Sequence, residues 1–103
     1  MPPMPLSRMT LVTVVAERLI APRIARELRD LGARGVTTTD VHGDGTRGVH
    51  ASEWEGPNVK IETVVPDDIG EAMVAHIAAL YFTHHAVIVY RHAVDVVRSE
   101  KYS

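Results

Sequence analysis

The two halves of the chain repeat the same order of elements, and this repeat restricts the fold more than any other feature of the sequence. The tripeptide Thr-Val-Val occurs at 13–15 and again at 63–65. After each copy comes a segment with apolar residues at helical spacing, and then a run of β-branched and apolar residues. The order β-α-β-β-α-β predicts the α+β class and the ferredoxin-like arrangement, a four-stranded antiparallel sheet with two helices on one face.

Two segments are predicted as helices, 21–32 and 66–82. Pro22 suits the first turn of one helix and Gly32 the position after its end, while the carboxylate of Asp67 suits the positive end of the other helix dipole. The apolar side of each helix is marked by residues at intervals of four, four and three: Ile20, Ile24, Leu28 and Leu31 in the first, and Ile69, Met73, Ile77 and Leu80 in the second. Each helix is therefore expected to bury one side against the sheet.

Four runs are predicted as strands: 9–16, 35–42, 58–65 and 85–92. We expect residues 1–8 to form a disordered tail before a domain at 9–103, and the last residues to add a short turn of helix or a further short strand. The strands carry apolar residues on both sides, as Val12 against Leu11 illustrates. A sheet that is apolar on both faces is usually buried on both, so the face without helices predicts an oligomer.

The composition argues against several classes of protein. The chain has 103 residues, no cysteine and a formal net charge of -2, which exclude disulfides and thiolate metal sites and disfavour a general nucleic-acid binder. No apolar run approaches the roughly 20 residues that a membrane span needs. The start of the chain has three prolines and no apolar segment typical of a signal peptide. We expect a cytoplasmic protein.

The loop predicted at 43–57 is too long for a simple hairpin, which needs only about two to five residues. Its first part, Gly-Asp-Gly-Thr-Arg-Gly, places Gly43, Gly45 and Gly48 around the hydroxyl of Thr46 and the guanidinium of Arg47. These glycines are explained either by loop flexibility or by an anion cradle, in which backbone N–H groups approach a phosphate. The sequence is neither a Walker A motif nor a dinucleotide-binding fingerprint, because no helix follows.

The chain shows no arrangement of residues typical of catalysis or of a metal site. No serine lies in a nucleophile elbow, so we expect a protein that is not an enzyme. The six histidines include no pair at i,i+4 spacing, and a metal needs ligands that converge from fixed positions. They are interpreted as polar surface or interface groups, with metal binding kept as the alternative. In the loop, Trp54 is either an anchor for a partner or packs on its own protein.

Three stretches of the sequence resemble the P-II signal-transduction proteins in the order and spacing of that family. They are "LGARGVTTTDVHGDG", "PNVKIETVVPDD" and "AVDVVRSEKY", and the similarity extends from residue 9 to about residue 102. The phrase "GDGTRGVHAS" is more similar to the PII-like branch associated with bicarbonate uptake and carboxysomes. The resemblance implies a homotrimer that binds adenine nucleotides in the clefts between subunits. The loop at 43–57 would be the family's T-loop, which contacts a target protein.

The resemblance also implies roles for single residues. Thr37 and the backbone around Val64 would contact the adenine. The phosphates would lie near the base of the loop and a C-terminal arginine, which are Gly43, Gly45, Thr46, Arg47, Gly48 and Arg98. Bicarbonate is assigned to Arg47 or Lys60, since either could hold it by charge-assisted hydrogen bonds. The partner would meet His50, Ser52 and Trp54, and it would be a membrane bicarbonate transporter or another carbon-uptake protein. Through such a partner the resemblance implies a cytoplasmic protein that is peripheral to a membrane or associated with a carboxysome.

The sequence differs from the family pattern at positions that affect which nucleotide is expected to bind. Asn58 replaces a lysine usual in nitrogen-regulatory members, and residues 82–86 replace their Gly-Asp-Gly-Lys phosphate loop. The T-loop has no tyrosine for uridylylation. Fewer phosphate contacts favour ADP, AMP or cyclic AMP over ATP with Mg²⁺. Two other classes stay open: a trimeric divalent-metal-binding protein of the cation-tolerance type, and a nucleic-acid-binding ferredoxin-like domain, for which Phe82 is the only phenylalanine.

Overall fold

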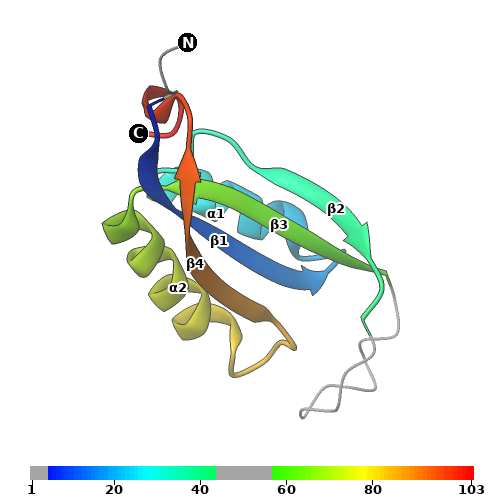
Figure 1. Ribbon diagram of the computed structural model, residues 1–103. Helices are drawn as coiled ribbons and strands as arrows, with labels where there is room; N and C mark the ends of the chain where they lie inside the picture. Colours follow the sequence, from blue (N-terminus) through cyan, green and yellow to red (C-terminus); the bar gives the residue numbers. More distant parts are fainter. Residues whose placement is uncertain (1–4, 44–56) are drawn as a thin grey trace.

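The computed structural model describes residues 5–43 and 57–103. The elements are β1 (Ser7–Glu17), α1 (Ala21–Leu31), β2 (Thr37–Val41), β3 (Asn58–Val65), α2 (Asp67–Tyr81), β4 (Ile88–Val96) and a short 3-10 helix, η2 (Ser99–Lys101). The four strands form one antiparallel sheet in the order β2-β3-β1-β4 (Figure 1). The predicted ferredoxin-like fold is confirmed.

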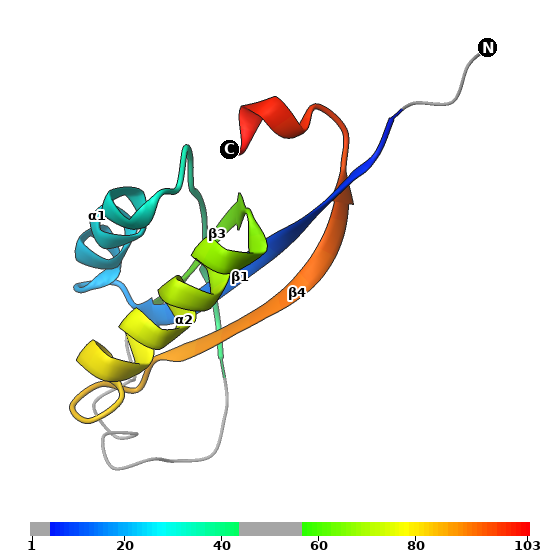
Figure 2. The same ribbon diagram turned by 90° about the vertical axis from the view of Figure 1, so that its left-hand side faces the viewer.

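Both helices lie on the same face of the sheet, as Figure 2 shows. The core forms between that face and the helices, and β1 runs through its middle with Val12 and Val14 fully buried. On α1, Ile24 and Leu28 are fully buried, as their spacing predicts. The helix ends at Leu31, and Gly32 follows it with a φ of 132°, a conformation that favours glycine.

The buried side of α2 differs from the prediction at its last turn. Met73 and Ile77 are fully buried, but Leu80 is 45% exposed and Tyr81 takes the expected position with no exposed surface. The interval of four from Ile77 to Tyr81 keeps the ring above the sheet. Its hydroxyl then reaches a polar partner on α1, Glu27, which makes the burial of a tyrosine favourable.

The last strand is shifted from the predicted range of 85–92. The backbone N–H groups of His84 and His85 donate to the carbonyl oxygen of Tyr81 at 3.3 and 2.8 Å, so this segment closes the last turn of α2. At the other end, β1 begins at Ser7, before the predicted start, and this provides pairing partners for β4 as far as Val96. The tail then forms η2, the turn of helix that was one of two alternatives.

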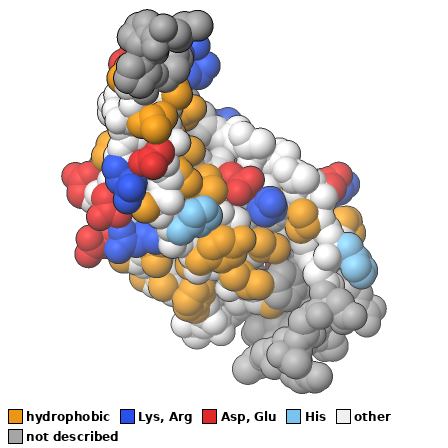
Figure 3. Space-filling model, in the orientation of Figure 1, with side chains coloured by type: hydrophobic (Ala, Val, Ile, Leu, Met, Phe, Trp, Pro, Cys, Tyr) orange, Lys and Arg blue, Asp and Glu red, His pale blue; other side chains and the backbone are white. Residues whose placement is uncertain are grey.

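The second face of the sheet carries no helix (Figures 1 and 2). Figure 3 shows hydrophobic side chains gathered on this face, bordered by charged groups. Ile88 and Tyr90 point to it from β4 and are 49% and 47% exposed. Beside them, Thr13 has a buried hydroxyl without a hydrogen-bond partner in the described residues. The open face is apolar along β1 and β4, as expected, but β3 places the charged side chains of Lys60 and Glu62 on it.

Candidate functional site

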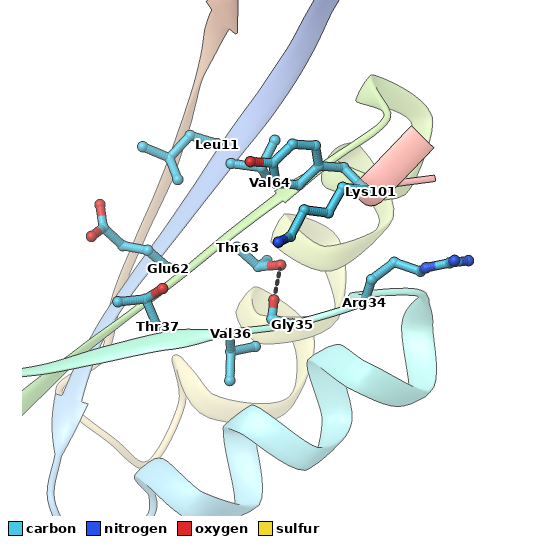
Figure 4. Close-up of a pocket in the computed structure, with 10 residues that line it drawn as sticks. Leu11, Arg34, Gly35, Val36, Thr37, Glu62, Thr63, Val64 and Lys101 are labelled. Atoms are coloured by element: carbon cyan, nitrogen blue, oxygen red, sulfur yellow. Dashed lines mark hydrogen bonds between the residues drawn. The ribbon is translucent and has the colours of Figure 1, made fainter. Parts of the chain in front are cut away.

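A pocket of about 480 Å³ lies beside β3, at the point where β2 begins (Figure 4). Its apolar wall consists of Leu11 from β1, Val64 from β3 and Val36 just before β2. Leu11 and Val64 are register partners in the β1–β3 ladder and therefore lie on one side of the sheet. Two neighbouring strands thus supply a small apolar wall of the pocket.

The pocket exists because β2 is shorter than β3. The ladder between these strands begins at the pair Thr37–Glu62, so residues 63–65 of β3 have no partner on β2. The chain before β2 is held instead by a side chain, since the Thr63 hydroxyl donates to the Gly35 carbonyl oxygen at 2.7 Å. A central strand directs its backbone groups alternately to its two neighbours. Those around Val64 that face β2 are therefore left for a ligand.

Polar and charged side chains also line the pocket. Thr37 and Glu62 lie together at one end (Figure 4), and the Glu62 carboxylate is 3.9 Å from the ammonium nitrogen of Lys60. Arg34 and Lys101 also line the pocket. Within 5–43 and 57–103 neither of these two cations has an ion-pair partner. A ligand with an apolar, hydrogen-bonding part and an anionic part fits this combination of side chains.

The structure brings together the two residues predicted to contact a base, Thr37 and Val64, in one pocket. Gly43 lies past the end of β2, and a methyl group there would be 3.6 Å from the Asn58 amide nitrogen. Lys60 does not line the pocket but lies beside Glu62. The other loop residues named above lie outside the described residues: Gly45, Thr46, Arg47, Gly48, His50, Ser52 and Trp54.

Arg98 does not line the pocket of its own chain. Its side chain is 69% exposed, and its nearest charged partner is the Glu100 carboxylate at 3.9 Å. The C-terminal residues that line the pocket are Lys101 and Tyr102. Neither is among the residues predicted to bind the nucleotide, because nothing in the local sequence fixes the direction of the tail. Glu62 was also missed, although strand alternation places it on the same side as Val64.

The histidines are spread over separate contacts. The His76 Nε2 atom is 3.0 Å from the Glu27 Oε1 atom, and the His85 Nδ1 atom is 3.5 Å from the Glu17 Oε1 atom. Among the described residues, no three histidine or acidic side chains lie close enough to hold a metal ion. In the same part of the chain, no helix is long and apolar enough to span a membrane.

The sequence and the fold both match known proteins. Residues 9–101 match the family of the nitrogen regulatory protein P-II. The structure superposes with a TM-score of 0.84 on a protein from Thermus thermophilus described as a PII-like signaling protein; the two are 42% identical over 97% of this chain and 100% of that one. The CPII protein from Thiomonas intermedia, solved with ADP and bicarbonate, gives a TM-score of 0.83 at 19% identity, over 98% and 100% of the two chains. Another structure of CPII contains ADP, AMP and acetate, at a TM-score of 0.83 and 19% identity over 96% and 98%.

Proposed function

The chain belongs to the P-II family, in its PII-like branch, and from this premise we propose that it is a non-enzymatic signalling protein that binds an adenine nucleotide. The observation that carries the proposal is the pocket beside β3, which joins Thr37 and Val64. Its volume of about 480 Å³ lies in the range of small-molecule sites, which are roughly 300–1,000 Å³. The CPII structures with ADP and AMP support the same ligand class.

The base would occupy the apolar part of the pocket. Leu11 and Val64 offer it a flat surface, while Thr37 and Glu62 offer hydrogen-bonding groups at its edge. Adenine has an exocyclic amine and ring nitrogens, so it can donate to a carboxylate and accept from a hydroxyl. The unpaired backbone edge around Val64 would complete the recognition of the base.

The phosphates would leave the pocket along β2 toward the T-loop, where Gly43, Gly45, Thr46, Arg47 and Gly48 are proposed to hold them. Arg98 is proposed as a further phosphate contact, made to the pocket of a neighbouring subunit. Its exposed guanidinium supports this, because it lies outside its own pocket. ADP or AMP is favoured over ATP because residues 82–86 lack the glycines and the lysine of the family's phosphate loop.

A homotrimer would cover the open face of the sheet. Ile88 and Tyr90 are about half exposed there, and the buried Thr13 hydroxyl lacks a partner in the described residues. Burial of apolar area favours association by roughly 25 cal/mol per Å² of surface removed from water. The second face of each sheet would then form the centre of the assembly.

Bicarbonate is proposed as a second ligand, held by Arg47 or Lys60. The support is the CPII structure with ADP and bicarbonate. At Lys60, bicarbonate would compete with the Glu62 carboxylate, which lies 3.9 Å from the ammonium nitrogen. Nucleotide and bicarbonate would change the T-loop, and its residues His50, Ser52 and Trp54 would contact a protein of inorganic-carbon uptake. Ligand and partner binding must then affect each other reciprocally. The protein would act in the cytoplasm.

Isothermal titration calorimetry with ADP and AMP, each with and without bicarbonate, tests the proposal. We expect binding of at least one nucleotide to the wild-type protein, and weaker binding by Thr37→Val. Thr39→Val is the matched control, since Thr39 is exposed on the same strand and does not line the pocket. Absence of heat with either nucleotide under all conditions would exclude the proposed ligand class.

A further inference from the structure

The outward side of α2 is apolar, although it faces away from the sheet. The exposed residues between 72 and 82 are Ala72, Ala75, Ala79, Leu80 and Phe82, and none of them is polar. Leu80 is 45% exposed and Phe82 is 51% exposed. A helix on a protein surface normally places polar and charged side chains on its outer face. α2 therefore presents apolar surface that another molecule can cover.

No described element covers this side of α2. Both helices lie on the same face of the sheet (Figure 2), and α2 buries Met73 and Ile77 in the core between them. Beside α2 lies α1, which is joined to it by the hydrogen bond between Tyr81 and Glu27. The proposed trimer would bury the opposite face of the sheet, so it would leave the outer side of α2 exposed.

α1 places positive charge beside this apolar surface. The segment 18–34 contains five of the 11 basic residues of the chain and only two of its 13 acidic residues. One of those acids, Glu27, already pairs with Arg23 at 3.2 Å. Arg26 and Arg29 are exposed and have no ion-pair partner within 5–43 and 57–103. The two helices thus combine an apolar outer side on α2 with a basic outer side on α1.

Arg26 and Arg29 are neighbours on α1, because residues three apart in a helix lie on the same side. Ile24 and Leu28 are fully buried against the sheet, so the two arginines lie on the exposed part of the helix. Guanidinium groups bind carboxylates through paired hydrogen bonds. A molecule that covers α2 and reaches α1 therefore needs an apolar side and an adjacent row of carboxylates.

We propose that the outer sides of α1 and α2 form a docking surface for an acidic amphipathic helix of another protein. Its apolar side would pack on Ala75 and Ala79, and its carboxylates would pair with Arg26 and Arg29. Helices pack with their axes about 8–10 Å apart, and alanine side chains permit the short end of that range. None of these residues lines the pocket or belongs to the T-loop, so the surface goes beyond the proposed function.

A membrane and a nucleic acid fit the surface less well than a helix does. Membrane binding depends on large apolar side chains that enter the lipid, whereas α2 offers mostly methyl groups of alanine. A nucleic acid requires an extended basic surface, and this chain has a formal net charge of -2. Small side chains beside a short basic row favour the close approach of a helix.

Fluorescence anisotropy with two labelled model peptides tests the docking surface. Each peptide is a helix of about 18 residues, long enough to be stable, with leucine along one side. The remaining side carries glutamate in one peptide and lysine in the other. We expect the glutamate peptide to bind the wild-type protein and the lysine peptide not to bind. Equal binding of both peptides, or binding of neither, would overturn the proposal.

The same titration with saturating ADP separates this surface from the nucleotide pocket. Because the docking residues lie outside the pocket, the Kd of the glutamate peptide should be the same with and without ADP. Displacement of the peptide by ADP would place it in the pocket and overturn the docking surface. A protein that binds the peptide but no nucleotide would keep this surface and lose the proposed function.

Substitutions on each helix locate the peptide. The double variant Arg26→Gln, Arg29→Gln should weaken the glutamate peptide by about fivefold or more, since two exposed ion pairs are lost. Arg8→Glu, on β1, changes the net charge by the same amount and should bind as wild type does. On α2, Ala75→Gln should also weaken binding by about fivefold, because a longer side chain keeps the helices apart. Ala93→Gln, at an exposed position of β4, is its control.

The controls and two further probes define the results that would contradict the proposal. Equal affinities of either variant and its control would show that the peptide binds elsewhere. Vesicles of phosphatidylcholine and phosphatidylserine test a membrane, and a labelled single-stranded DNA oligonucleotide tests a nucleic acid. Tighter binding of either one than of the glutamate peptide, lost in the double variant, would overturn a helix as the occupant and assign the surface to that molecule.

Discussion

The hydroxyl of Tyr81 on α2 donates a hydrogen bond of 2.7 Å to Oε1 of Glu27 on α1. The same carboxylate accepts a bond from the Arg23 guanidinium through its other oxygen at 3.2 Å, and the Arg23 guanidinium carbon lies 5.2 Å from the centre of the Tyr81 ring. His76 Nε2 is 3.0 Å from Glu27 Oε1. One partly buried carboxylate therefore ties the two helices together above the sheet.

We predict that Tyr81→Phe destabilises the fold by about 1–3 kcal/mol, since it removes a hydrogen bond to a charged group and leaves the ring in place. Chemical denaturation without nucleotide measures the change. Tyr102→Phe is the control, because the Tyr102 hydroxyl makes no hydrogen bond to the described residues and its removal should change stability little. Equal stability of wild type and Tyr81→Phe would show that the bond contributes nothing net.

The hydrogen bond between Tyr81 and Glu27 also predicts that the protein loses stability at alkaline pH. Burial, and then the hydrogen bond and charge of Glu27, raise the pKa of Tyr81 from 10.0 to about 12. The folded state therefore holds this proton where the unfolded state releases it, so the contribution is full below pH 10 and is lost as the pH rises toward 12. Its size is on the order of 2 kcal/mol. Wild type should lose more stability than Tyr81→Phe between pH 9 and 11.5, and parallel curves would contradict the assignment.

The Glu27 carboxylate predicts a loss of stability at acid pH. Burial alone would raise the pKa of this carboxyl, but hydrogen bonds from Tyr81, His76 and Arg23 outweigh it, and the pKa lies below the ordinary 4.5. Since the folded pKa is depressed, the contribution is present above pH 4.5 and fades as the pH falls through the folded value. We expect Glu27→Gln to be less stable than wild type at pH 7 and the difference to shrink by pH 3. Unfolding midpoints of both proteins at the two pH values provide the measurement, and a constant difference would count against the mechanism.

Gly70 marks a close contact of α2 with the sheet. A Cβ atom there would lie 2.9 Å from the Thr10 Cγ2 atom, closer than carbon atoms pack. Gly70→Ala should therefore destabilise the fold by roughly 1–3 kcal/mol, although alanine normally favours a helix by about 1 kcal/mol over glycine. Gly35→Ala is the matched control, since nothing lies within 4 Å of its Cβ position. Thermal unfolding distinguishes the two, and a stabilised Gly70→Ala protein would show that the helix shifts freely.

The sequence predicts those features that depend on periodicity. Ile24, Leu28 and Met73 are buried because one interval pattern decides their side of the helix. The choice of Tyr81 over Leu80 depends on a hydroxyl partner, Glu27, on the other helix. Such a partner far away in the sequence leaves no trace in local spacing.

The candidate site likewise contains residues that the sequence predicts and residues that it does not. Thr37 and Val64 were predicted from the resemblance and lie in one pocket, because strand pairing places β2 beside β3. Lys101 and Tyr102 join them only through the left-handed turn at Arg98, which arginine does not favour locally. A residue whose conformation is imposed by its surroundings cannot be found from its own preference.

Glu62 provides the last prediction, since it is the carboxylate in the pocket and lies opposite Thr37 in the β2–β3 ladder. A carboxylate that accepts from an adenine amine or a ribose hydroxyl forms a strong, charge-assisted hydrogen bond. Glu62→Gln keeps the shape and removes the charge, so ADP affinity should fall by about tenfold, which corresponds to roughly 1.4 kcal/mol. Glu71→Gln, on the exposed side of α2, should bind as wild type does. Calorimetry with ADP on wild type and the two variants measures the change in affinity. A tighter complex with Glu62→Gln would mean that the carboxylate faces the phosphates and repels them. The ligand would then lie in the opposite orientation.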